Sequence, residues 1–357
     1  SVKANECLGG LKGCSYSVTI QTMFESASGG VIAGYGGGSG GGFKRGGEML
    51  GYRSGAAFVA VGGGLWRARS EAQPARKRWR TAMTAKVVLV TGATDGIGRH
   101  TAGNLAKMGH TVLVHGRDPK KVKSTADQLR EGGGEVEEYV ADFSRLSDVK
   151  KLGDEIKSKH DSLDILINNA GVFATEKKQS ADGFELTWAV NVLAPFALVV
   201  KLLPLLKAAP EARIINVASI SHSDGGAGRR GGEFDFTNLQ HENGYDMYSA
   251  YGLSKLAVVT FTYEMAERLK DTHITVNTCD PGTVNTKMLL AGWGRCGIDT
   301  SSANDETYLA TAPQLKDQTG KYFVGRRESR SASSTYDRQI RMKLWQELET
   351  MSGLKFE

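Results

Sequence analysis

Tyr251 and Lys255 are the two residues of this chain whose types and spacing are best suited to chemistry. They lie four residues apart within 249–270, where apolar residues recur at three- and four-residue steps. That pattern predicts a helix with both side chains on one face. An ammonium group beside a phenol favours the phenolate, so the pKa of the tyrosine falls and it can exchange a proton near neutral pH. Because this spacing is also common on solvated helices, the pair needs partners elsewhere in the chain.

Two polar residues on other predicted elements are candidate partners. Ser219 follows a predicted strand at 213–217, and the carboxyl ends of parallel strands are where active sites lie. Asn191 lies inside a long apolar stretch, 183–207, which predicts a helix in which an amide side chain needs a buried partner. A capping role for Ser219 and a backbone hydrogen bond for Asn191 are the alternatives. The four residues together favour a site, because each stands on the expected kind of element.

Two neighbours of Tyr251 are given no catalytic role. Tyr248 lacks a lysine partner, because Gly252 stands four residues after it. Ser254 is predicted to be an ordinary helix residue.

From Lys86 onward, short apolar runs that predict strands alternate with stretches that predict helices. This alternation implies an α/β fold: a single doubly wound parallel sheet, Rossmann-like and of about seven strands, with helices on both faces. The predicted strands are 87–90, 111–114, 136–140, 164–167, 213–217 and 275–278, and the predicted helices are 97–108, 120–130, 145–159, 183–207 and 249–270.

A glycine-rich turn joins the first predicted strand to the first predicted helix. Glycines let the backbone turn sharply and let a pyrophosphate approach the helix N-terminus, where N–H groups lack partners. The turn therefore predicts a dinucleotide site, and a strand-to-helix turn without a ligand is the alternative. Its candidate cofactor-binding residues are Gly92, Thr94, Gly96, Ile97 and Gly98.

The spacing of Gly92 and Gly96 resembles that of the short-chain dehydrogenase/reductase family, and further matches follow in order along residues 86–325. The N-N-A-G motif of the family is matched by Asn168-Asn169-Ala170-Gly171. Asp142 resembles the acid that typically meets the adenine. The family's P-G-x-x-x-T motif, which faces the nicotinamide, is matched by Pro281-Gly282-Thr283 together with Thr286. The resemblance implies that these residues bind the cofactor.

The resemblance also implies roles for the four polar residues. Tyr251 would protonate the carbonyl oxygen and Ser219 would hydrogen-bond to it. Lys255 would lower the pKa of Tyr251 and grip the nicotinamide ribose, and Asn191 would hold a proton-relay water near Lys255. The cofactor would carry the hydride, and the reverse reaction would oxidise an alcohol.

The end of the second predicted strand bears on the choice of nicotinamide. Arg117 offers a planar fork suited to a 2′-phosphate, while Asp118 is predicted to cap the helix that opens at Pro119. These residues favour NADP(H). NAD(H) is the alternative, because Asp95 occupies a loop position where some NADP-binding relatives carry a base.

The long segment between Ser219 and Tyr251 includes Phe234-Asp235-Phe236-Thr237-Asn238-Leu239 and resembles the retinol dehydrogenase/WW-domain oxidoreductase branch, although Asp280 stands where that branch often has His. We expect neither an N-terminal membrane anchor nor a WW module. Met, Leu and Trp in 288–294 favour a small lipophilic carbonyl or alcohol, such as a retinoid, a steroid or another lipophilic aldehyde or ketone. Packing of these side chains onto the core is the alternative.

Three other functions stay open. A non-catalytic NADPH-binding regulator would not need the intact set of four polar residues. A sugar-nucleotide epimerase would more often show G-x-x-G-x-x-G in the first turn. A protochlorophyllide-reductase-like enzyme would reduce a C=C bond.

Residues 1–83 differ from the rest of the chain, with nineteen glycines and a net charge of +7 against −1 for residues 84–357. Such a segment buries too little apolar surface to offset its ordering entropy. We therefore predict a disordered leader before one Rossmann domain over 84–357. The leader could be an organelle-targeting peptide, a flexible tail, or non-native upstream sequence that ends at Met83. The expected location is cytoplasmic, or organellar if the leader is a targeting peptide.

Composition argues against several classes of partner. The near-neutral domain gives no reason to expect nucleic acid. The longest apolar stretch, 186–206, is interrupted by an Asn, a Lys and two Pro, so we predict no transmembrane helix. The four cysteines have no metal-ligand spacing, which predicts no metal site and favours a reduced compartment. A homodimer through helices 183–207 and 249–270 is a further prediction.

Overall fold

The computed structural model of the protein describes residues 59–61, 64–66, 85–223 and 232–357. The chain divides into two units, Ser1–Trp79 and Arg80–Glu357. In the first unit the described residues form two short strands, β1 (Val59–Val61) and β2 (Gly64–Trp66), which pair antiparallel. Apart from these strands, the predicted disordered leader lies outside the described residues.

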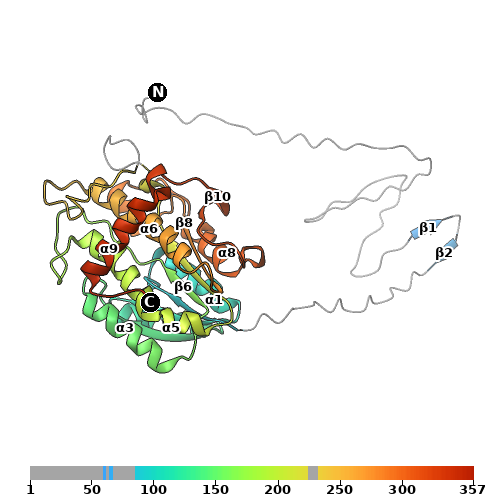
Figure 1. Ribbon diagram of the computed structural model, residues 1–357. Helices are drawn as coiled ribbons and strands as arrows, with labels where there is room; N and C mark the ends of the chain where they lie inside the picture. The colour runs from blue at the N-terminus through green and yellow to red at the C-terminus, as the bar shows by residue number, and fades with distance from the viewer. Residues whose placement is uncertain (1–58, 62–63, 67–84, 224–231) are drawn as a thin grey trace, which may run out of the picture. The chain divides into compact units, whose positions relative to one another are not determined.

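The second unit is built on one eight-stranded sheet with helices on both sides (Figure 1). The strand order is β10-β9-β8-β7-β6-β3-β4-β5, and all neighbours are parallel except β9 and β10. From β3 the chain first builds outward through β4 and β5, and then returns to place β6 on the other side of β3. That change of direction is the switch point at which open α/β sheets bind ligands. The strands are β3 (Val87–Val90), β4 (Thr111–Gly116), β5 (Glu135–Val140), β6 (Ile165–Asn168), β7 (Ala212–Val217), β8 (Ile274–Asp280), β9 (Tyr322–Val324) and β10 (Arg327–Ser329).

Two hydrophobic cores, one on each face of the sheet, hold the layers together. Successive side chains of a strand point to opposite faces of the sheet, so Leu89 of β3 lies in one core and Val88 and Val90 lie in the other. Both faces of the parallel strands are therefore apolar, as the continuous Val/Leu runs of the sequence predict. One face is covered by α3 (Leu146–Lys159), α5 (Ala194–Ala208), α6 (Met247–Arg268) and α9 (Arg338–Ser352), and the other by α1 (Gly96–Lys107), α2 (Pro119–Glu131) and α8 (Asp305–Thr311).

The doubly wound sheet predicted from the sequence is confirmed, with additions at one edge. β9 and β10 were not predicted, because each has only three residues and β10 reads Arg-Glu-Ser. Asp118 caps α2 as predicted, with its carboxylate accepting from the N–H groups of Lys120 and Lys121.

The long apolar helix is interrupted where the sequence predicts one continuous element over 183–207. Glu185 caps the short helix α4 (Leu186–Trp188), and a π-helical turn, η1 (Ala189–Leu193), precedes α5. In the described part of the chain, Leu186–Ala208 is the one run long and apolar enough by composition to cross a membrane. Its most apolar window is 83% buried inside the domain, which is the environment of a core helix.

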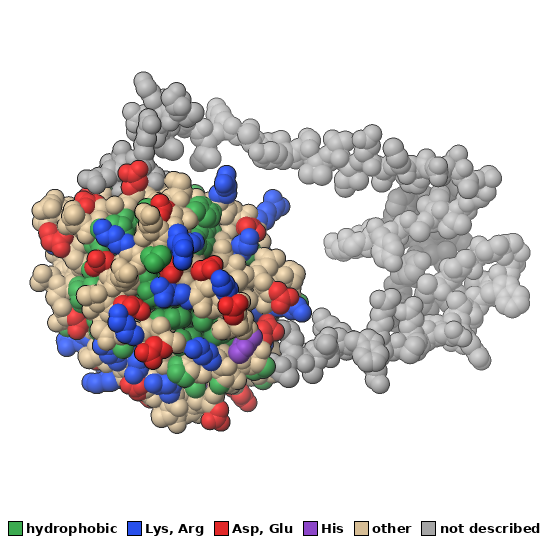
Figure 2. Space-filling model, in the orientation of Figure 1, with side chains coloured by type: hydrophobic (Ala, Val, Ile, Leu, Met, Phe, Trp, Pro, Cys, Tyr) green, Lys and Arg blue, Asp and Glu red, His purple; other side chains and the backbone are tan. Residues whose placement is uncertain are grey.

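Charged side chains of both signs lie on the face of the molecule that Figure 2 displays. On the face that Figure 2 displays, basic and acidic side chains are interspersed, so this face carries no continuous basic area. In addition, α9 packs against α6, one of the two helices predicted to form a dimer interface. Pairing of two copies stays a prediction.

Candidate active site

A pocket of about 670 Å³ lies at the carboxyl ends of the central strands. It brings together residues that are far apart in the sequence, from the glycine turn after β3 to the segment after β8. Most of the predicted cofactor-binding residues line it: Gly92, Thr94, Gly96, Ile97, Gly98, Arg117, Asp142, Asn169, Ala170, Gly171, Tyr251, Lys255, Pro281 and Thr286. Gly282 and Thr283 are outside this lining, and the backbone carbonyl of Thr283 instead accepts from the N–H of Ile298.

The glycine turn is braced by the segment that follows β6. Asn169 Nδ2 donates to the carbonyls of Thr91 (2.8 Å) and Gly92 (3.3 Å), while Thr91 Oγ1 accepts from the N–H groups of Asn169 and Ala170. Gly92 has a φ of +66°. A Cβ atom on Gly98 would collide with the Asn169 side chain and the Gly92 carbonyl. Glycine is therefore required at Gly92 by the left-handed backbone and at Gly98 by the close packing of α1 against Asn169 and the Gly92 carbonyl.

Two charged residues that line the pocket beside this turn form an ion pair. Asp95 caps α1 by accepting from the N–H of Gly96 (2.9 Å), and its other oxygen pairs with Lys287 of α7 (Lys287–Gly292). The Lys287 ammonium lowers the pKa of Asp95. Asp95 and Lys287 thereby join the glycine turn to the loop predicted to cover the substrate.

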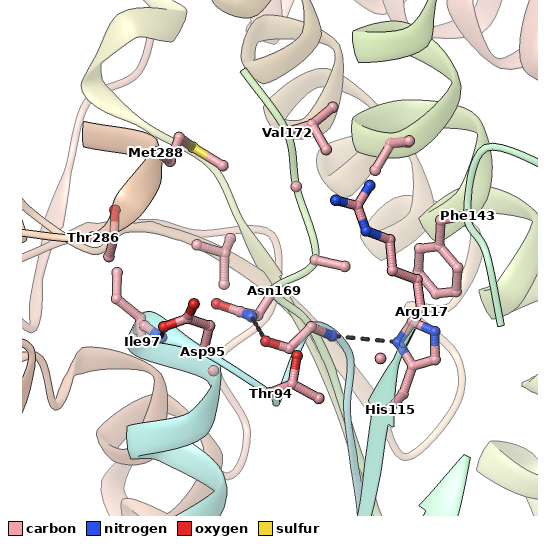
Figure 3. A pocket seen from close by; sticks show the side chains of 18 of the residues that line it. Thr94, Asp95, Ile97, His115, Arg117, Phe143, Asn169, Val172, Thr286 and Met288 are labelled. Atoms are coloured by element: carbon pink, nitrogen blue, oxygen red, sulfur yellow. Dashed lines mark hydrogen bonds between the residues drawn. The ribbon is translucent and has the colours of Figure 1, made fainter. Parts of the chain in front are cut away.

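Arg117 extends from the end of β4 at the opposite end of the pocket, near His115 and Phe143 (Figure 3). Among the described residues it forms no ion pair. The carboxylate of its neighbour Asp118 caps α2. Arg117 is thus the charged group that this end of β4 offers to a ligand, with Lys121 also lining the pocket.

Tyr251 and Lys255 lie on α6 and are both almost fully buried. Lys255 Nζ lies 5.6 Å from the centre of the Tyr251 ring and donates to the Val217 carbonyl (2.8 Å). Burial raises the pKa of Tyr251 to about 12 and lowers the pKa of Lys255 to about 8. The sequence predicts instead that Lys255 lowers the pKa of Tyr251. The difference arises because burial penalises both charged forms, an effect that a four-residue spacing does not reveal.

Ser219 sits immediately after β7 and has two roles. Its Oγ accepts from the N–H of Ser221 (3.2 Å), which is the capping role considered from the sequence. Its hydroxyl is also a hydrogen-bond partner of Tyr251 and lowers the pKa of that phenol, against the larger effect of burial. The capping role and the catalytic role predicted for Ser219 are therefore compatible.

Asn191 lies in the π-helical turn and is 2% exposed. Its Oδ1 accepts from the N–H of Val172 (2.8 Å), and its Nδ2 donates to the Val172 carbonyl (3.0 Å) and to Ser254 Oγ (3.0 Å). Ser254 in turn donates to the Tyr251 carbonyl (2.7 Å). Ser254, predicted to be an ordinary helix residue, lies within α6, is fully buried and joins Asn191 to this helix. π-helical turns often occur at functional sites.

Three aromatic side chains form a cluster next to Tyr251. Phe173, Tyr248 and Trp293 have ring centres 4.8 to 5.5 Å from one another, and Phe173 and Trp293 lie 5.5 and 5.8 Å from the Tyr251 ring. Tyr248 Oη donates to the Gly292 carbonyl (2.7 Å), so its hydroxyl is engaged in holding the end of α7. We call Phe173, Tyr248 and Trp293 the aromatic wall.

His115 lines the pocket and was assigned no role from the sequence. The signal was present but indistinct: a histidine stands near the end of a strand that is otherwise apolar, two residues before Arg117. Its hydrogen bonds join segments remote in the sequence, which no local pattern reveals.

Comparison with known proteins points to one family. The model of the short chain dehydrogenase family matches residues 86–230 and 238–292. Human retinol dehydrogenase 14 is 33% identical, over 84% of this chain and 97% of the relative. Human polyprenol dehydrogenase is 32% identical, over 75% of this chain and 86% of the relative.

Solved structures are similar in the same region. An uncharacterized protein from Mycobacterium paratuberculosis has a TM-score of 0.64 and 28% identity, over 76% of this chain and 95% of that structure. The RhlG/NADP active-site complex of Pseudomonas aeruginosa has a TM-score of 0.55 and 26% identity, over 68% of this chain and 94% of that structure.

Proposed function

Because the chain belongs to the short-chain dehydrogenase/reductase family, we propose that it is an NADP(H)-dependent oxidoreductase that interconverts a carbonyl and an alcohol on a lipophilic small molecule. Family membership and the retinol dehydrogenases among its relatives make it an oxidoreductase of CH–OH groups. One observation carries the finer proposal: Tyr251 and Lys255 line the same pocket as the glycine turn. A proton donor and a dinucleotide-binding turn therefore face one ligand space.

The residues fit a nicotinamide dinucleotide. The open glycine turn precedes the N-terminus of α1, and Asp142 and Arg117 line the pocket beyond it. In this proposal Gly92, Gly96 and Gly98 leave room for the pyrophosphate, Asp142 meets the adenine, and Asn169 to Gly171 with Thr286 line the path towards the nicotinamide. The bound cofactor would supply the hydride.

The proton chemistry is assigned to the four polar residues. Tyr251 Oη donates its proton to the carbonyl oxygen as that oxygen gains negative charge, and the Ser219 hydroxyl hydrogen-bonds to the same oxygen. The Lys255 ammonium stabilises the phenolate left on Tyr251 and holds the nicotinamide ribose. Asn191 orients this end of α6 through Ser254, and a relay water near it stays part of the proposal.

NADP(H) rather than NAD(H) is favoured by Arg117, which is available for a 2′-phosphate. A solved relative of 26% identity is an NADP complex, in keeping with this choice.

We expect Arg117→Ala to raise KM for NADPH about 10- to 100-fold, because charge-assisted hydrogen bonds to the 2′-phosphate are lost. KM for NADH, which has no such phosphate, should change less than about threefold, as measured by initial rates with each cofactor. Lys120→Ala is the matched control, since Lys120 is exposed on α2 and does not line the pocket. Equal effects on both cofactors would contradict the assignment.

A lipophilic substrate is supported by the aromatic wall near Tyr251 and by Leu290 and Trp293, which are exposed in and at the end of α7. Two relatives are named for retinol and polyprenol, both apolar isoprenoid alcohols. We therefore propose a retinoid, steroid or other lipophilic aldehyde or ketone.

The test is NADPH oxidation, followed by its absorbance, with retinal, steroid ketones, quinones and small polar aldehydes. The highest kcat/KM is expected for a lipophilic carbonyl. Turnover of small polar aldehydes alone would overturn the substrate class. NADPH binding without turnover of any carbonyl would favour the regulator.

Three finer points stay proposals. The leader over 1–83 and the domain over 84–357 are tested by sequencing the N-terminus of the native protein. A cytoplasmic or organellar location is tested by cell fractionation, and a homodimer by sedimentation.

A further inference from the structure

The side chain of His115, the penultimate residue of β4, joins the carboxyl ends of two other strands. The N–H of Gly92, after β3, donates to His115 Nδ1 (3.3 Å), and His115 Nε2 lies 3.1 Å from the Ala141 carbonyl, after β5. Figure 3 shows His115 and Asn169 reaching the glycine turn from opposite sides. The backbone of His115 adds a third bond, since its carbonyl accepts from the N–H of Ala93 (2.8 Å).

These contacts fix the chemical form of the ring. A backbone N–H can only donate, so Nδ1 must be unprotonated and Nε2–H must donate to the Ala141 carbonyl. His115 is 3% exposed, and burial lowers its pKa to about 4, in agreement with a neutral ring at pH 7. The ring therefore uses both nitrogens in bonds to the protein and has none left for a ligand.

The ring also supports one wall of the pocket. It stacks on Phe143, with centres 4.3 Å apart and planes inclined by 20°. Phe143 lines the pocket beside Asp142. His115 thus contacts the glycine turn on one side and the Ala141–Phe143 segment on the other, while Arg117 follows two residues later, just past the end of β4.

We propose that His115 is a positioning residue for cofactor binding, which sets the distance between the glycine turn, Arg117 and the segment Ala141–Phe143. This inference rests on the proposed NADP(H) site, because those three segments are the ones assigned to the pyrophosphate, the 2′-phosphate and the adenine. His115 itself touches none of the reacting atoms, so its effect falls on binding rather than on proton transfer.

The test is the variant His115→Phe, which keeps an aromatic ring against Phe143 and removes both side-chain hydrogen bonds. NADPH binding is measured directly by quenching of tryptophan fluorescence in the full chain, and turnover is measured at saturating substrate. Kd and KM for NADPH are expected to rise at least about tenfold, with kcat at saturating NADPH within about threefold of the wild type. A fall in kcat with an unchanged Kd would overturn the proposal.

His110→Phe is the matched control. His110 stands just before β4, is 1% exposed and accepts from the N–H of Lys86 (3.3 Å), but does not line the pocket. It should lower the thermal midpoint without changing the Kd for NADPH. Equal Kd changes in both histidine variants would mean that His115 acts only through general stability.

A second variant keeps the test informative if His115→Phe does not fold. His115→Asn is shorter and can retain at most one of the two hydrogen bonds, so its Kd for NADPH is expected to rise at least about threefold. An unchanged Kd in this variant overturns the inference. If the wild type binds NADPH and the variants bind it with the same Kd, only the role of His115 is refuted. If the wild type does not bind NADPH, the proposed function is refuted as well.

Discussion

Replacing Tyr251 by phenylalanine is expected to lower kcat for carbonyl reduction by at least about a thousandfold, because the proton donor is lost. NADPH binding should change less than about threefold, since the aromatic ring that lines the pocket remains. The burial that raises the pKa of Tyr251 to about 12 keeps its proton in place over the whole range of a practical assay. Single-turnover rates and fluorescence titration with NADPH measure the two quantities separately.

Two other tyrosines of α6 make this experiment specific. Tyr263 is buried on the same helix and bonds to Ser331 away from the pocket, so Tyr263→Phe should leave kcat within about twofold. Tyr248 belongs to the aromatic wall, so Tyr248→Phe should act mainly on KM for the substrate. Near-normal turnover in Tyr251→Phe, or a larger loss of kcat in Tyr248→Phe, would show that the proton donor has been misassigned.

The elements that the sequence predicts well are those whose signal is local. Three elements can be recognised from a few consecutive residues, and each forms as predicted: the apolar strand Val87–Val90, the glycine turn, and the helix start at Asp118–Pro119. Parallel strands with both faces buried need such runs, so the sheet could be predicted from them. The strands β9 and β10 were missed because three residues at a sheet edge are too short for a pattern.

The parts of the site that could not be predicted depend on tertiary contacts. Ser254 has its role because Asn191 reaches it across 63 residues of sequence, and His115 has its role because Gly92 and Ala141 converge on one ring. The sequence predicts a lowered pKa for Tyr251, and this prediction was wrong for the same reason. A helical spacing shows which groups are neighbours, whereas the loss of solvent that dominates the shift comes from the whole fold.

Lys255 gives the second large prediction: Lys255→Met should abolish turnover and yet stabilise the protein. The side chain is 4% exposed, and Val217 provides its one hydrogen bond among the described residues. Burial lowers its pKa to about 8 from an ordinary value of 10.5. This difference between the folded and the ordinary pKa means that burial of the charged ammonium lowers the free energy of unfolding at pH 7 by about 3 kcal/mol. Methionine fills a similar volume without the charge.

The ionisation of Lys255 makes the stability of the protein depend on pH. Because the folded pKa lies below the unfolded one, the unfolded chain binds more protons between pH 8 and 10.5, so this group makes the free energy of unfolding rise with pH in that window. The variant lacks this rise. Lys255→Met is therefore expected to be about 2 to 3 kcal/mol more stable than the wild type at pH 7, with the difference shrinking towards pH 10. Urea unfolding at several pH values measures it.

Loss of activity in a stabilised variant would separate chemistry from folding. We expect kcat to fall at least about a hundredfold in Lys255→Met, because the phenolate of Tyr251 loses its neighbouring positive charge. Lys151→Met makes the same charge change at an exposed position of α3 and should alter neither kcat nor the pH dependence of stability. A destabilised Lys255→Met, or a stability difference that does not narrow as the pH rises, would mean that the buried ammonium is fully compensated. Inactivity with added stability would instead show that the fold tolerates Lys255 at a cost, which is the pattern expected of a residue retained for catalysis.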